Sequence, residues 1–471
     1  MKSVDVAIIG GGSAGYAAAR TAVSEGLETL VIEGGREMGG LCILRGCMPS
    51  KALIESANRF RTLQRAEEFG LRASAIAAKA DEIVARKDQL IREFADYRRE
   101  QLEDGRFELI RGTATFVNNN EVEVRHFDGT RESVYAKAFV IATGSVIQVP
   151  NIPGLAEIDF ITSDEALGLK SIPASMIVLG AGPVALEMAH YFSTIGVKVS
   201  VIQRSDQVLK GVDPDVAKVV ESAFRDRGVE VFTNTQILGI RQEGGTGEKV
   251  VQFVHRDREI VLEADVVLNA LGRSPNIIGL GLDKIGVETL NGRIRTTETM
   301  QTSVSNVFAA GDVCGPYEVV HEAIAQGETA SRNIARILGK RSDAKLEMMN
   351  YRLKLFAVFT DPEVGVVGMS EEEAKKARIE VVAATYPFID HGKSLVMGET
   401  HGFVKLIMDV KSGEICGGAV VGPHASELIH EVVVAMAFRA TPAQFARIPH
   451  YHPTLSEIWS YPAEELAGYT I

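Results

Sequence analysis

Two cysteines in a glycine-rich segment have the side chains that thiol redox chemistry requires. Cys42 and Cys47 lie five positions apart within residues 39–51. On a regular α-helix, about 7.5 Å of rise would separate them, beyond the roughly 7 Å that a disulfide can bridge. They can pair only where Cys42 lies in a loop or a distorted turn, and the glycines of this segment supply that backbone freedom.

The proline after the second cysteine indicates where a helix begins. Pro49 is tolerated in a first helical turn, so we expect Cys47 near a helix N-terminus, where the helix dipole lowers the pKa of a thiol and makes it reactive. Two unrelated buried cysteines would explain neither the glycines nor this proline.

A glycine-rich turn near the N-terminus predicts a dinucleotide site. The apolar run 4–9 predicts a strand that leads into this turn, and an alanine-rich helix is expected over 16–24. Such a turn lets the backbone and the helix N–H groups approach a pyrophosphate, while an acid at the end of the next strand, expected over 30–32, binds a ribose hydroxyl. A tight turn alone would not require that acid. The residues of this site are Gly10, Gly12, Gly15 and Glu33.

The same glycine-rich pattern returns after residue 175, but a different type of residue fills the position of the acid. The turn contains Gly180 and Gly182 but has Ala185 as its third small residue, and the strand 198–202 ends in Gln203 and Arg204 rather than in an acid. A carboxylate there would accept from the 2′-hydroxyl of NAD, whereas these donors suit a 2′-phosphate. We therefore favour NADP over NAD, the alternative being that Arg204 is a solvated surface side chain.

Composition restricts the class of protein. The 471 residues are too many for one core, and the apolar (46%) and charged (24%) fractions are those of globular proteins. A formal net charge of −12 and the lack of a basic, aromatic-rich cluster argue against nucleic acid as a partner. No apolar run is long enough for a membrane span and the N-terminus does not resemble a secretory signal, so we expect a cytoplasmic protein. The other two cysteines, Cys314 and Cys416, are expected to be buried or incidental thiols.

The remaining elements are expected at the following positions. One long amphipathic helical stretch should run from about 51 to 103, followed by strands within 108–124. A turn is expected at 271–276, a strand ending at Gly311 and Asp312, and a helix over 321–338. From about 347 onward, strands such as 403–408 alternate with helices such as 426–440, which predicts a separate α/β module.

The cysteine segment and the two nucleotide units resemble the flavoprotein disulfide reductases, the class I pyridine nucleotide-disulfide oxidoreductases, through essentially the whole chain. The resemblance implies a glutathione reductase-like α/β fold, with two Rossmann-like domains and a C-terminal α/β dimerisation domain. The implied domains are residues 1–148 (FAD-binding, first part), 149–270 (NAD(P)-binding), 271–345 (FAD-binding, second part) and 346–471 (dimerisation).

The resemblance also assigns cofactor contacts. Asp312 would bind the flavin ribityl chain, and Lys51 and Glu187 match the ion pair that lies beside flavin N5 in the family. The remaining FAD contacts implied are Lys51, Gly112, Ala114, Thr143, Gly144, Ser145 and Gly311. Those implied for NAD(P) are Gly180, Gly182, Glu187, Gln203, Arg204, Lys210 and Gly272, of which Arg204 and Lys210 match two basic positions of glutathione reductases. No metal site is expected.

The segment 451–457 matches the acid–base segment of the family. An imidazole near neutral pKa can take a proton from a thiol and return it, with a carboxylate orienting the ring. His452 and Glu457 would fill these roles, although His450 is nearby. Because this segment reaches into the partner subunit in the family, the resemblance implies a homodimer with composite active sites. Cys42 would be the interchange thiol and Cys47 the charge-transfer thiolate.

Within the family, the segments 360–364 and 422–429 resemble dihydrolipoyl dehydrogenases, and a C-terminus without cysteines disfavours mercuric ion reduction. Two features depart from that subfamily, namely Arg45 beside the cysteines and the Gln203–Arg204 pair. We therefore expect an NADP-preferring, dihydrolipoyl dehydrogenase-like enzyme that acts on a lipoyl-type dithiol. The alternatives are an NADPH-dependent reductase of another low-molecular-weight disulfide or small acceptor, and a non-catalytic redox-sensing subunit.

Overall fold

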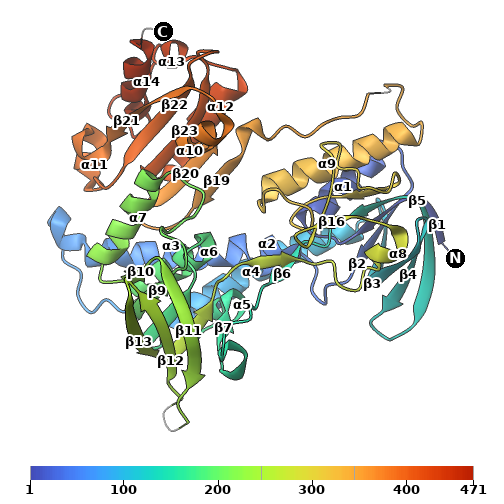
Figure 1. Cartoon of the computed structure of the whole chain (residues 1–471), viewed down its shortest axis with the longest axis horizontal. Helices are drawn as coiled ribbons and strands as arrows, with labels where there is room; N and C mark the ends of the chain where they lie inside the picture. Colours follow the sequence, from blue (N-terminus) through green and yellow to red (C-terminus); the bar gives the residue numbers. More distant parts are fainter. Residues whose placement is uncertain (1, 245–246, 344, 470–471) are drawn as a thin grey trace. The chain divides into compact units, whose positions relative to one another are not determined.

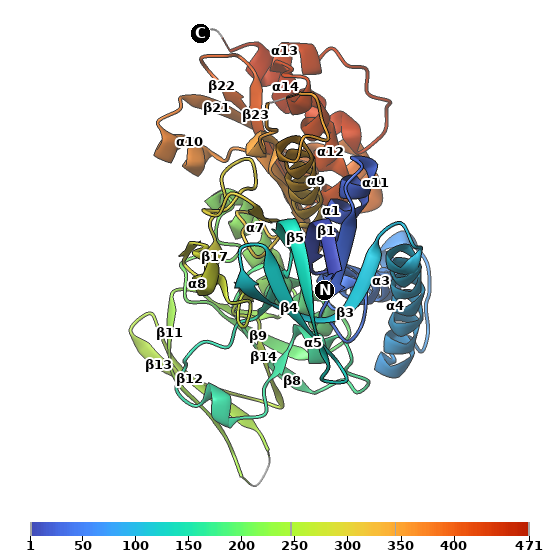
Figure 2. The same ribbon diagram turned by 90° about the vertical axis from the view of Figure 1, so that its right-hand side faces the viewer.

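The two apolar runs before the glycine-rich turns form β1 (Lys2–Ile9) and β8 (Ser175–Leu179), which pair with parallel neighbours in two different sheets; β1 is labelled in Figure 1 and β8 in Figure 2. The structure, a computed structural model, describes residues 2–244, 247–343 and 345–469. It divides into two compact units, and each is built from three stretches of chain. Unit 1 is Met1–Ala52, Ala85–Gln148 and Gly272–Asn350, and unit 2 is Leu53–Val84, Val149–Leu271 and Tyr351–Ile471. The four domain boundaries expected from the sequence stay predictions.

Unit 1 is built on a sheet whose central strand is buried on both faces. β1 pairs in parallel with β2 and β5, β2 pairs with β3 and β5 with β18, while β4 joins β3 and β5 in an antiparallel meander. Val6 and Ile8 face a core shared with α1 and α9, which lie side by side, and Val4 and Ile9 face the opposite core. Its remaining elements are α1 (Ser13–Ser24), β2 (Thr29–Glu33), α2 (Gly40–Leu44), β3 (Glu108–Asn118), β4 (Glu121–His126), β5 (Arg131–Ile141), β6 (Ser145–Ile147), β15 (Arg273–Pro275), α8 (Leu282–Ile285), β16 (Thr289–Leu290), β17 (Arg293–Ile294), β18 (Val307–Ala309) and α9 (Val320–Ile337).

The first part of unit 2 repeats this plan. Its parallel sheet has the order β10-β9-β8-β14-β7, and a separate antiparallel sheet of β11, β12 and β13 stands beside it (Figure 2). The elements are η2 (Leu155–Glu157), β7 (Ile161–Thr162), α5 (Ser163–Ala166), α6 (Pro183–Thr194), β9 (Lys198–Ile202), α7 (Pro214–Asp226), β10 (Glu230–Phe232), β11 (Thr235–Gln242), β12 (Lys249–His255), β13 (Arg258–Ala264) and β14 (Val266–Asn269).

The C-terminal part of unit 2 is a five-stranded antiparallel sheet of order β19-β20-β23-β22-β21, with α12 packed on β20 and β23 and α14 on β21 and β22. Together with the two parallel sheets, it confirms the predicted α/β class. The elements are η3 (Tyr351–Leu353), β19 (Leu355–Val358), β20 (Glu363–Gly368), α10 (Glu371–Ala377), β21 (Val381–Pro387), η4 (Phe388–Asp390), α11 (Gly392–Met397), β22 (Phe403–Asp409), β23 (Ile415–Gly422), α12 (Ala425–Ala437), α13 (Pro442–Phe445), η5 (Ser456–Trp459) and α14 (Ser460–Ala467).

The prediction of one helical stretch over 51–103 is wrong. The chain forms α3 (Cys47–Gln64) and α4 (Ala80–Glu103), with only a short 3₁₀ turn, η1 (Ala66–Phe69), between them. Gly70 ends this turn in the left-handed conformation, and almost every side chain over 71–79 is exposed. A helix there would have no apolar face to bury, so packing does not stabilise it.

The turn expected at 271–276 is also wrong. Residues 273–275 form β15, which pairs antiparallel with β6, so that Arg273 lies opposite Ile147 and Pro275 opposite Ser145. The Ser-Pro-Asn sequence is typical of turns, but a partner strand more than a hundred residues earlier holds the backbone extended. The local sequence alone therefore does not predict the pairing of β15 with β6.

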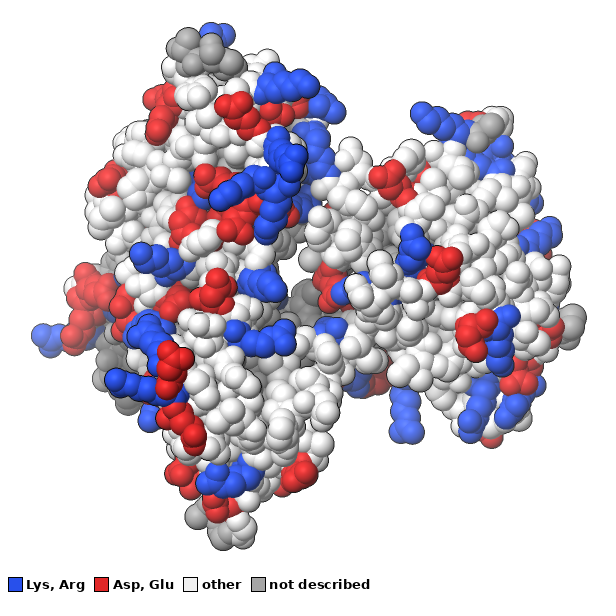
Figure 3. Space-filling model, in the orientation of Figure 1, with Lys and Arg blue, Asp and Glu red and all other residues white. Residues whose placement is uncertain are grey.

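Charged side chains are mixed in sign on the surface. On the face shown in Figure 3, Lys and Arg side chains lie among Asp and Glu side chains and form no continuous basic stripe. Among the helices of residues 2–244, 247–343 and 345–469, none has the length and hydrophobicity needed to cross a membrane.

A buried lysine connects the two parts of unit 2. Lys405, on β22, is 1% exposed, and its Nζ lies 2.5 Å from Asp215, 2.7 Å from Glu371 and 3.3 Å from Asp213. Burial alone would lower the pKa of Lys405, but hydrogen bonds to Asp215 and Glu371 raise it above the usual lysine value. Asp213 also accepts from the backbone N–H of Glu371 and Glu372, so the start of α7 is bound to the start of α10.

We expect Lys405→Met to lower the free energy of unfolding by about 3 kcal/mol, because removing one partner of a buried ion pair leaves the other charges uncompensated. Urea unfolding followed by circular dichroism measures the change. Lys376→Met is the matched control, since Lys376 is exposed and its pair with Glu372 lies on the surface of α10, where such pairs contribute about 0.5 kcal/mol or less. Equal effects of the two variants would contradict this account of Lys405.

Candidate functional site

The first glycine-rich turn is a place where side chains cannot fit. Gly10, at the end of β1, has φ +107°, and a Cβ there would strike the carbonyl of Ala142, while a Cβ on Gly15 would strike the carbonyl of Gly10. α1 begins after Gly12 with no side-chain cap and no acid in its first turn. Its first N–H groups are therefore available to an anion such as a pyrophosphate.

The acid predicted to bind ribose lies against this turn. Glu33 ends β2 and is 8% exposed, with Oε2 accepting from the N–H of Gly11 at 2.7 Å and Oε1 from the N–H of Gly35 at 2.5 Å. The acid is thus next to the turn, as a strand-turn-helix nucleotide site requires.

Two further segments predicted to contact FAD meet although they are far apart in the sequence. Ser145 Oγ donates to Asp312 Oδ2 at 2.7 Å and accepts from Arg273 Nε at 2.8 Å. Thr143 Oγ1 donates to the carbonyl of Asn276 at 2.7 Å, just beyond the end of the β6–β15 strand pair. Asp312 is therefore held by a hydroxyl that is itself held by an arginine.

Gly311, before that aspartate, has φ +82°, and its N–H donates to Gln326 Oε1 at 2.7 Å. Gln326 is completely buried on α9. Neither Gln326 nor Arg273 was predicted from the sequence as part of this site. A polar residue on the buried face of the expected helix 321–338 was a signal for Gln326, whereas Arg273 was hidden by the wrong turn assignment.

The cysteine segment has the broken geometry that pairing requires. Cys42 lies in α2, Cys47 is the first residue of α3, and the helix is interrupted at Arg45 (φ −143°) and Gly46. A hydrogen bond with the Cys47 side chain, followed by burial, raises the pKa of Cys42 far above its usual value, and the Lys51 charge opposes this only in part. The two thiols are therefore in contact, with Cys47 at the helix N-terminus. Arg45 forms an ion pair with Glu37.

This segment packs directly on the glycine-rich turn. Gly40 has φ +73°, and a Cβ there would lie 2.7 Å from Cα of Gly12. Backbone therefore touches backbone between the expected pyrophosphate site and the two thiols, which brings the two functions together in unit 1.

The second glycine-rich turn, in unit 2, has a similar backbone conformation but leaves more space around its glycines. Gly180 has φ +103°, and a Cβ there would lie 2.6 Å from the carbonyl of Ala270. Gly182 has no atom within 4 Å of such a Cβ, and Pro183 begins α6. Ala185 is fully buried, so this turn accommodates the methyl group that Gly15 excludes in the first copy.

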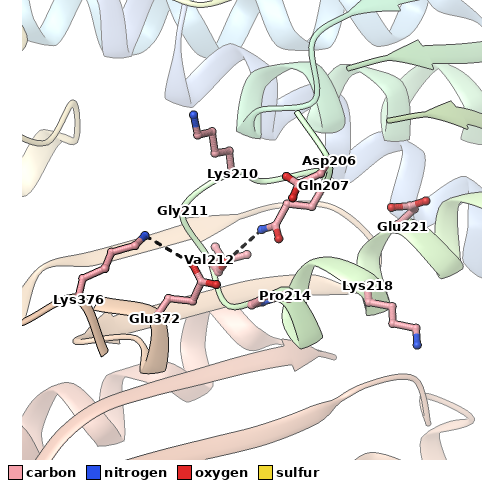
Figure 4. Close-up of a pocket in the computed structure, with 10 residues that line it drawn as sticks. All are labelled: Asp206, Gln207, Lys210, Gly211, Val212, Pro214, Lys218, Glu221, Glu372 and Lys376. Carbon is pink, nitrogen blue, oxygen red and sulfur yellow. Dashed lines mark hydrogen bonds and ion pairs between the residues drawn. The ribbon is translucent and has the colours of Figure 1, made fainter. Parts of the chain in front are cut away.

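The residues predicted to distinguish NADP from NAD follow β9. Gln203 is half-buried, and its backbone carbonyl accepts from the Thr235 N–H at 3.1 Å, whereas Arg204 and Lys210 are exposed. The loop continues into a pocket of about 520 Å³ that α7 and α10 complete (Figure 4). Lys210 adds one of the basic groups that line this pocket; the lining residues are Asp206, Gln207, Lys210, Gly211, Val212, Pro214, Lys218, Glu221, Glu372 and Lys376.

Lys51 and Glu187 belong to different units, so the ion pair between them stays a prediction. Glu187 is 4% exposed in α6, and its Oε1 accepts from the N–H of Phe359 at 3.2 Å. Of the other expected cofactor contacts, Gly112 and Ala114 lie in β3, and Gly112 has no room for a Cβ beside Val124 and Arg125. Gly272 has φ +115° directly before β15.

The two candidate histidines differ in their exposure and in the carboxylate that each of them contacts. His452 is 80% exposed, and its Nδ1 lies 2.9 Å from Glu457 Oε2. His450 is buried and its Nε2 lies 3.1 Å from Glu431. Only His452 combines an oriented ring with a ring nitrogen open to an incoming group, which is the geometry of an acid–base residue.

The two remaining cysteines are half-buried. Burial raises the pKa of Cys314 to about 12 and that of Cys416 to about 11, so both stay protonated at neutral pH. Within the described part of the chain, no group of three or more His, Cys, Asp or Glu side chains is arranged to hold a metal ion.

Known proteins share these features over almost the whole chain. The family described as pyridine nucleotide-disulphide oxidoreductase matches residues 4–327, and its dimerisation domain matches residues 356–462. The dihydrolipoyl dehydrogenase of Geobacillus stearothermophilus is 32% identical over 465 residues (98% of this chain, 96% of that protein), and that of Chlamydia trachomatis is 35% identical over 463 residues (98% and 96%).

Solved structures agree with these matches. LpdA from Mycobacterium tuberculosis has a TM-score of 0.86 at 27% identity, covering 99% of this chain and 100% of that one. The HOCl-induced flavoprotein disulfide reductase RclA from Escherichia coli, as a Cu(II) complex, has a TM-score of 0.84 at 25% identity, covering 99% and 100%.

The contact between Gly40 and Gly12 gives a direct test of the assembled site. We expect Gly40→Ala to be purified with less than about a tenth of the wild-type flavin, because the methyl group would push the cysteine segment off the turn. The ratio of absorbance at 450 nm to that at 280 nm measures bound flavin. Gly26→Ala is the control, since Gly26 has the same positive φ (+74°) but open space around its Cβ. Equal flavin loss in both variants would show that backbone strain, and not the contact, is responsible.

Proposed function

This chain belongs to the pyridine nucleotide-disulphide oxidoreductase family, and from that premise we propose that it transfers electrons between NADP(H) and a lipoyl-type dithiol through Cys42 and Cys47. The membership confirms the resemblance, the glutathione reductase-like fold and the presence of a dimerisation domain expected from the sequence. The protein is an oxidoreductase, and its family uses FAD and a nicotinamide nucleotide. The observation that carries the proposal is the contact between the two thiols at the N-terminus of α3.

The residues of unit 1 fit FAD. The turn formed by Gly10, Gly12 and Gly15 leads into α1, whose first N–H groups have no side-chain cap and can bind a pyrophosphate, and the carboxylate of Glu33 lies beside it. Asp312 presents a carboxylate held by Ser145. When bound, FAD supplies two-electron transfer between the nicotinamide and the thiol pair.

The thiol chemistry follows from the roles of four side chains. A substrate thiolate attacks Cys42 Sγ of the Cys42–Cys47 disulfide, which forms a mixed disulfide and releases Cys47 as a thiolate. The second substrate thiolate then attacks the substrate sulfur of the mixed disulfide, so the substrate leaves as a cyclic disulfide and Cys42 leaves as a thiolate. His452 takes the proton of the attacking thiol, and the carboxylate of Glu457 stabilises the imidazolium. The enzyme thiols have gained the two electrons that the substrate lost.

The assembly completes this site. His452 is exposed in the single chain and lies in the C-terminal part of unit 2, within the residues matched by the dimerisation domain. We infer a homodimer in which His452 of each chain serves the thiols of the other. This arrangement gives the solvent-facing ring a partner and makes the site composite.

The lipoyl assignment is supported by relatives. Proteins that share 32–35% of their residues over almost the full length of this chain are named dihydrolipoyl dehydrogenases. The second candidate function is the reduction of another low-molecular-weight disulfide, and the structural likeness to RclA favours it. Arg45 also favours it, because this residue places a cation between the two cysteines in the sequence, where it pairs with Glu37. A dithiol panel separates the two. A non-catalytic subunit is disfavoured because both cysteines, His452 and Glu457 are present.

The choice of substrate is tested by an anaerobic visible spectrum of the holoenzyme. We expect a few equivalents of dihydrolipoamide to bleach the 450 nm band, because its thiols reduce the Cys42–Cys47 disulfide and the electrons pass onward. Cys42→Ser is the control and should not respond. If only NADPH bleaches the wild-type band, the lipoyl assignment fails and another acceptor must be sought.

The choice of nucleotide is tested at the end of β9. We expect Arg204→Ala to lower kcat/KM for NADPH by about 10- to 100-fold, the loss of one charge-assisted phosphate contact, and to change that for NADH less than about twofold. Arg241→Ala, an exposed arginine on β11 that pairs with Glu243, is the control. A parallel loss for both nucleotides would show that Arg204 does not recognise a 2′-phosphate.

A further inference from the structure

The carboxylate of Glu457 is shared by two histidines. Its Oε2 lies 2.9 Å from Nδ1 of His452, and its Oε1 lies 3.3 Å from Nε2 of His391. The Glu457 side chain is 12% exposed, that of His391 is 0% exposed, and that of His452 is 80% exposed. One oxygen therefore serves the exposed imidazole and the other faces a buried one.

Besides Glu457, His391 contacts the side chain of Ser394. It lies between η4 and α11, and its Nδ1 is 2.9 Å from Oγ of the buried Ser394. The contact of its Nε2 with Glu457 has the distance of an ion pair but not the alignment of a hydrogen bond. Among the residues that the structure describes, this nitrogen has no hydrogen-bond partner. A buried ring nitrogen without a partner costs free energy, so the facing carboxylate oxygen is the acceptor it needs.

The chemistry of the neighbours sets the tautomer. A carboxylate can only accept, so Nε2 of His391 must carry the proton that faces Glu457. The other nitrogen, Nδ1, then accepts from the hydroxyl of Ser394. The contacts therefore run from Ser394 through His391 and Glu457 to His452, with hydrogen bonds at the two ends and an ion-pair distance between His391 and Glu457.

The surroundings favour a neutral His391. The titratable groups that face its ring are Glu457 from η5, His452 from the preceding loop and Tyr461 from α14, whose ring lies at 6.5 Å and nearly perpendicular. Burial lowers the pKa of His391 and the His452 charge adds to this, while Glu457 opposes it only in part. Tyr461 is itself stacked on Tyr386 at 3.9 Å, which closes that side with an aromatic pair. A neutral ring donates without adding a positive charge next to His452.

We propose that His391 is a positioning residue for the thiol reaction: its Nε2–H faces the distal oxygen of Glu457 and restrains that carboxylate, so that the other oxygen keeps its direction toward His452. The inference deepens the proposed function, since it rests on His452 and Glu457 as the acid–base pair. The physical reason is that a carboxylate held at one oxygen can rotate, whereas one held at both presents a fixed direction to the imidazole.

The test compares His391→Leu with His391→Asn in the holoenzyme. Leu fills much of the volume without a donor, whereas the Asn amide can still donate to Glu457. We expect His391→Leu to slow flavin reduction by dihydrolipoamide about tenfold, in the range of losses for residues that orient a reactive group. The pH profile of this step should move upward, because a carboxylate without its second donor attracts the His452 proton more strongly. His391→Asn should recover most of the rate and the profile.

Flavin reduction by NADPH is the internal control, because it does not use His452 and should stay unchanged in His391→Leu and His391→Asn. A double-mutant cycle with Glu457→Ala separates positioning from general damage: His391→Leu should add almost nothing once Glu457 is removed. The proposal is overturned if His391→Leu keeps the wild-type rate and pH profile, or if its effect multiplies with that of Glu457→Ala.

Failure of the lipoyl assignment would give a different result. If the wild-type enzyme does not react with dihydrolipoamide but does react with dithiothreitol, only the assignment of a lipoyl substrate is contradicted. The wild type and the His391 variants are then compared with dithiothreitol as the reductant. A histidine-selective ¹⁵N NMR titration of His452 measures the coupling without turnover, and an unchanged pKa of His452 in His391→Leu would also overturn the proposal.

Discussion

The close approach of backbone to backbone around the first glycine-rich turn is the constraint on which the rest of unit 1 depends. Gly10 and Gly15 leave no room for side chains inside the turn, and Gly40 brings the cysteine segment onto Gly12. Because peptide groups rather than side chains are in contact there, the expected pyrophosphate site and the two thiols are fixed relative to each other. A reaction that needs electrons to pass between a bound flavin and a thiol pair benefits from this rigidity.

The reactive groups themselves are set by charge and burial. Cys47 begins a helix, and its hydrogen bond with Cys42 raises the pKa of the Cys42 thiol; both side chains are half-buried. His452 is directed by Glu457, and a second, buried histidine lies on the other oxygen of the same carboxylate. In each case an exposed or reactive group is held by a less exposed one, which is how a protein orients side chains that must meet a substrate.

Local patterns in the sequence predicted helices and strands correctly where the pattern is periodic or depends on backbone conformation. β9 has the predicted bounds, and α1 and α9 begin or end within a few positions of the expected ones. The prediction failed at 51–103, where helical periodicity continued across a segment that has nothing to pack against, and at 273–275, where a distant strand overrides a turn sequence. His391 and Arg273 gave no usable motif, because their roles depend on contacts with residues distant in sequence.

The sequence by itself determined the family, the α/β class and the types of reactive group, because glycines at fixed spacing, a cysteine pair and a His–Glu segment are chemical requirements that can be read without coordinates. Only the tertiary structure decided which of these groups touch. Ser145 meets Asp312 across 167 positions, and His391 meets Glu457 although α11, β22, β23, α12 and α13 lie between them in the sequence, because packing of distant segments, and not local propensity, fixes which polar side chains face each other.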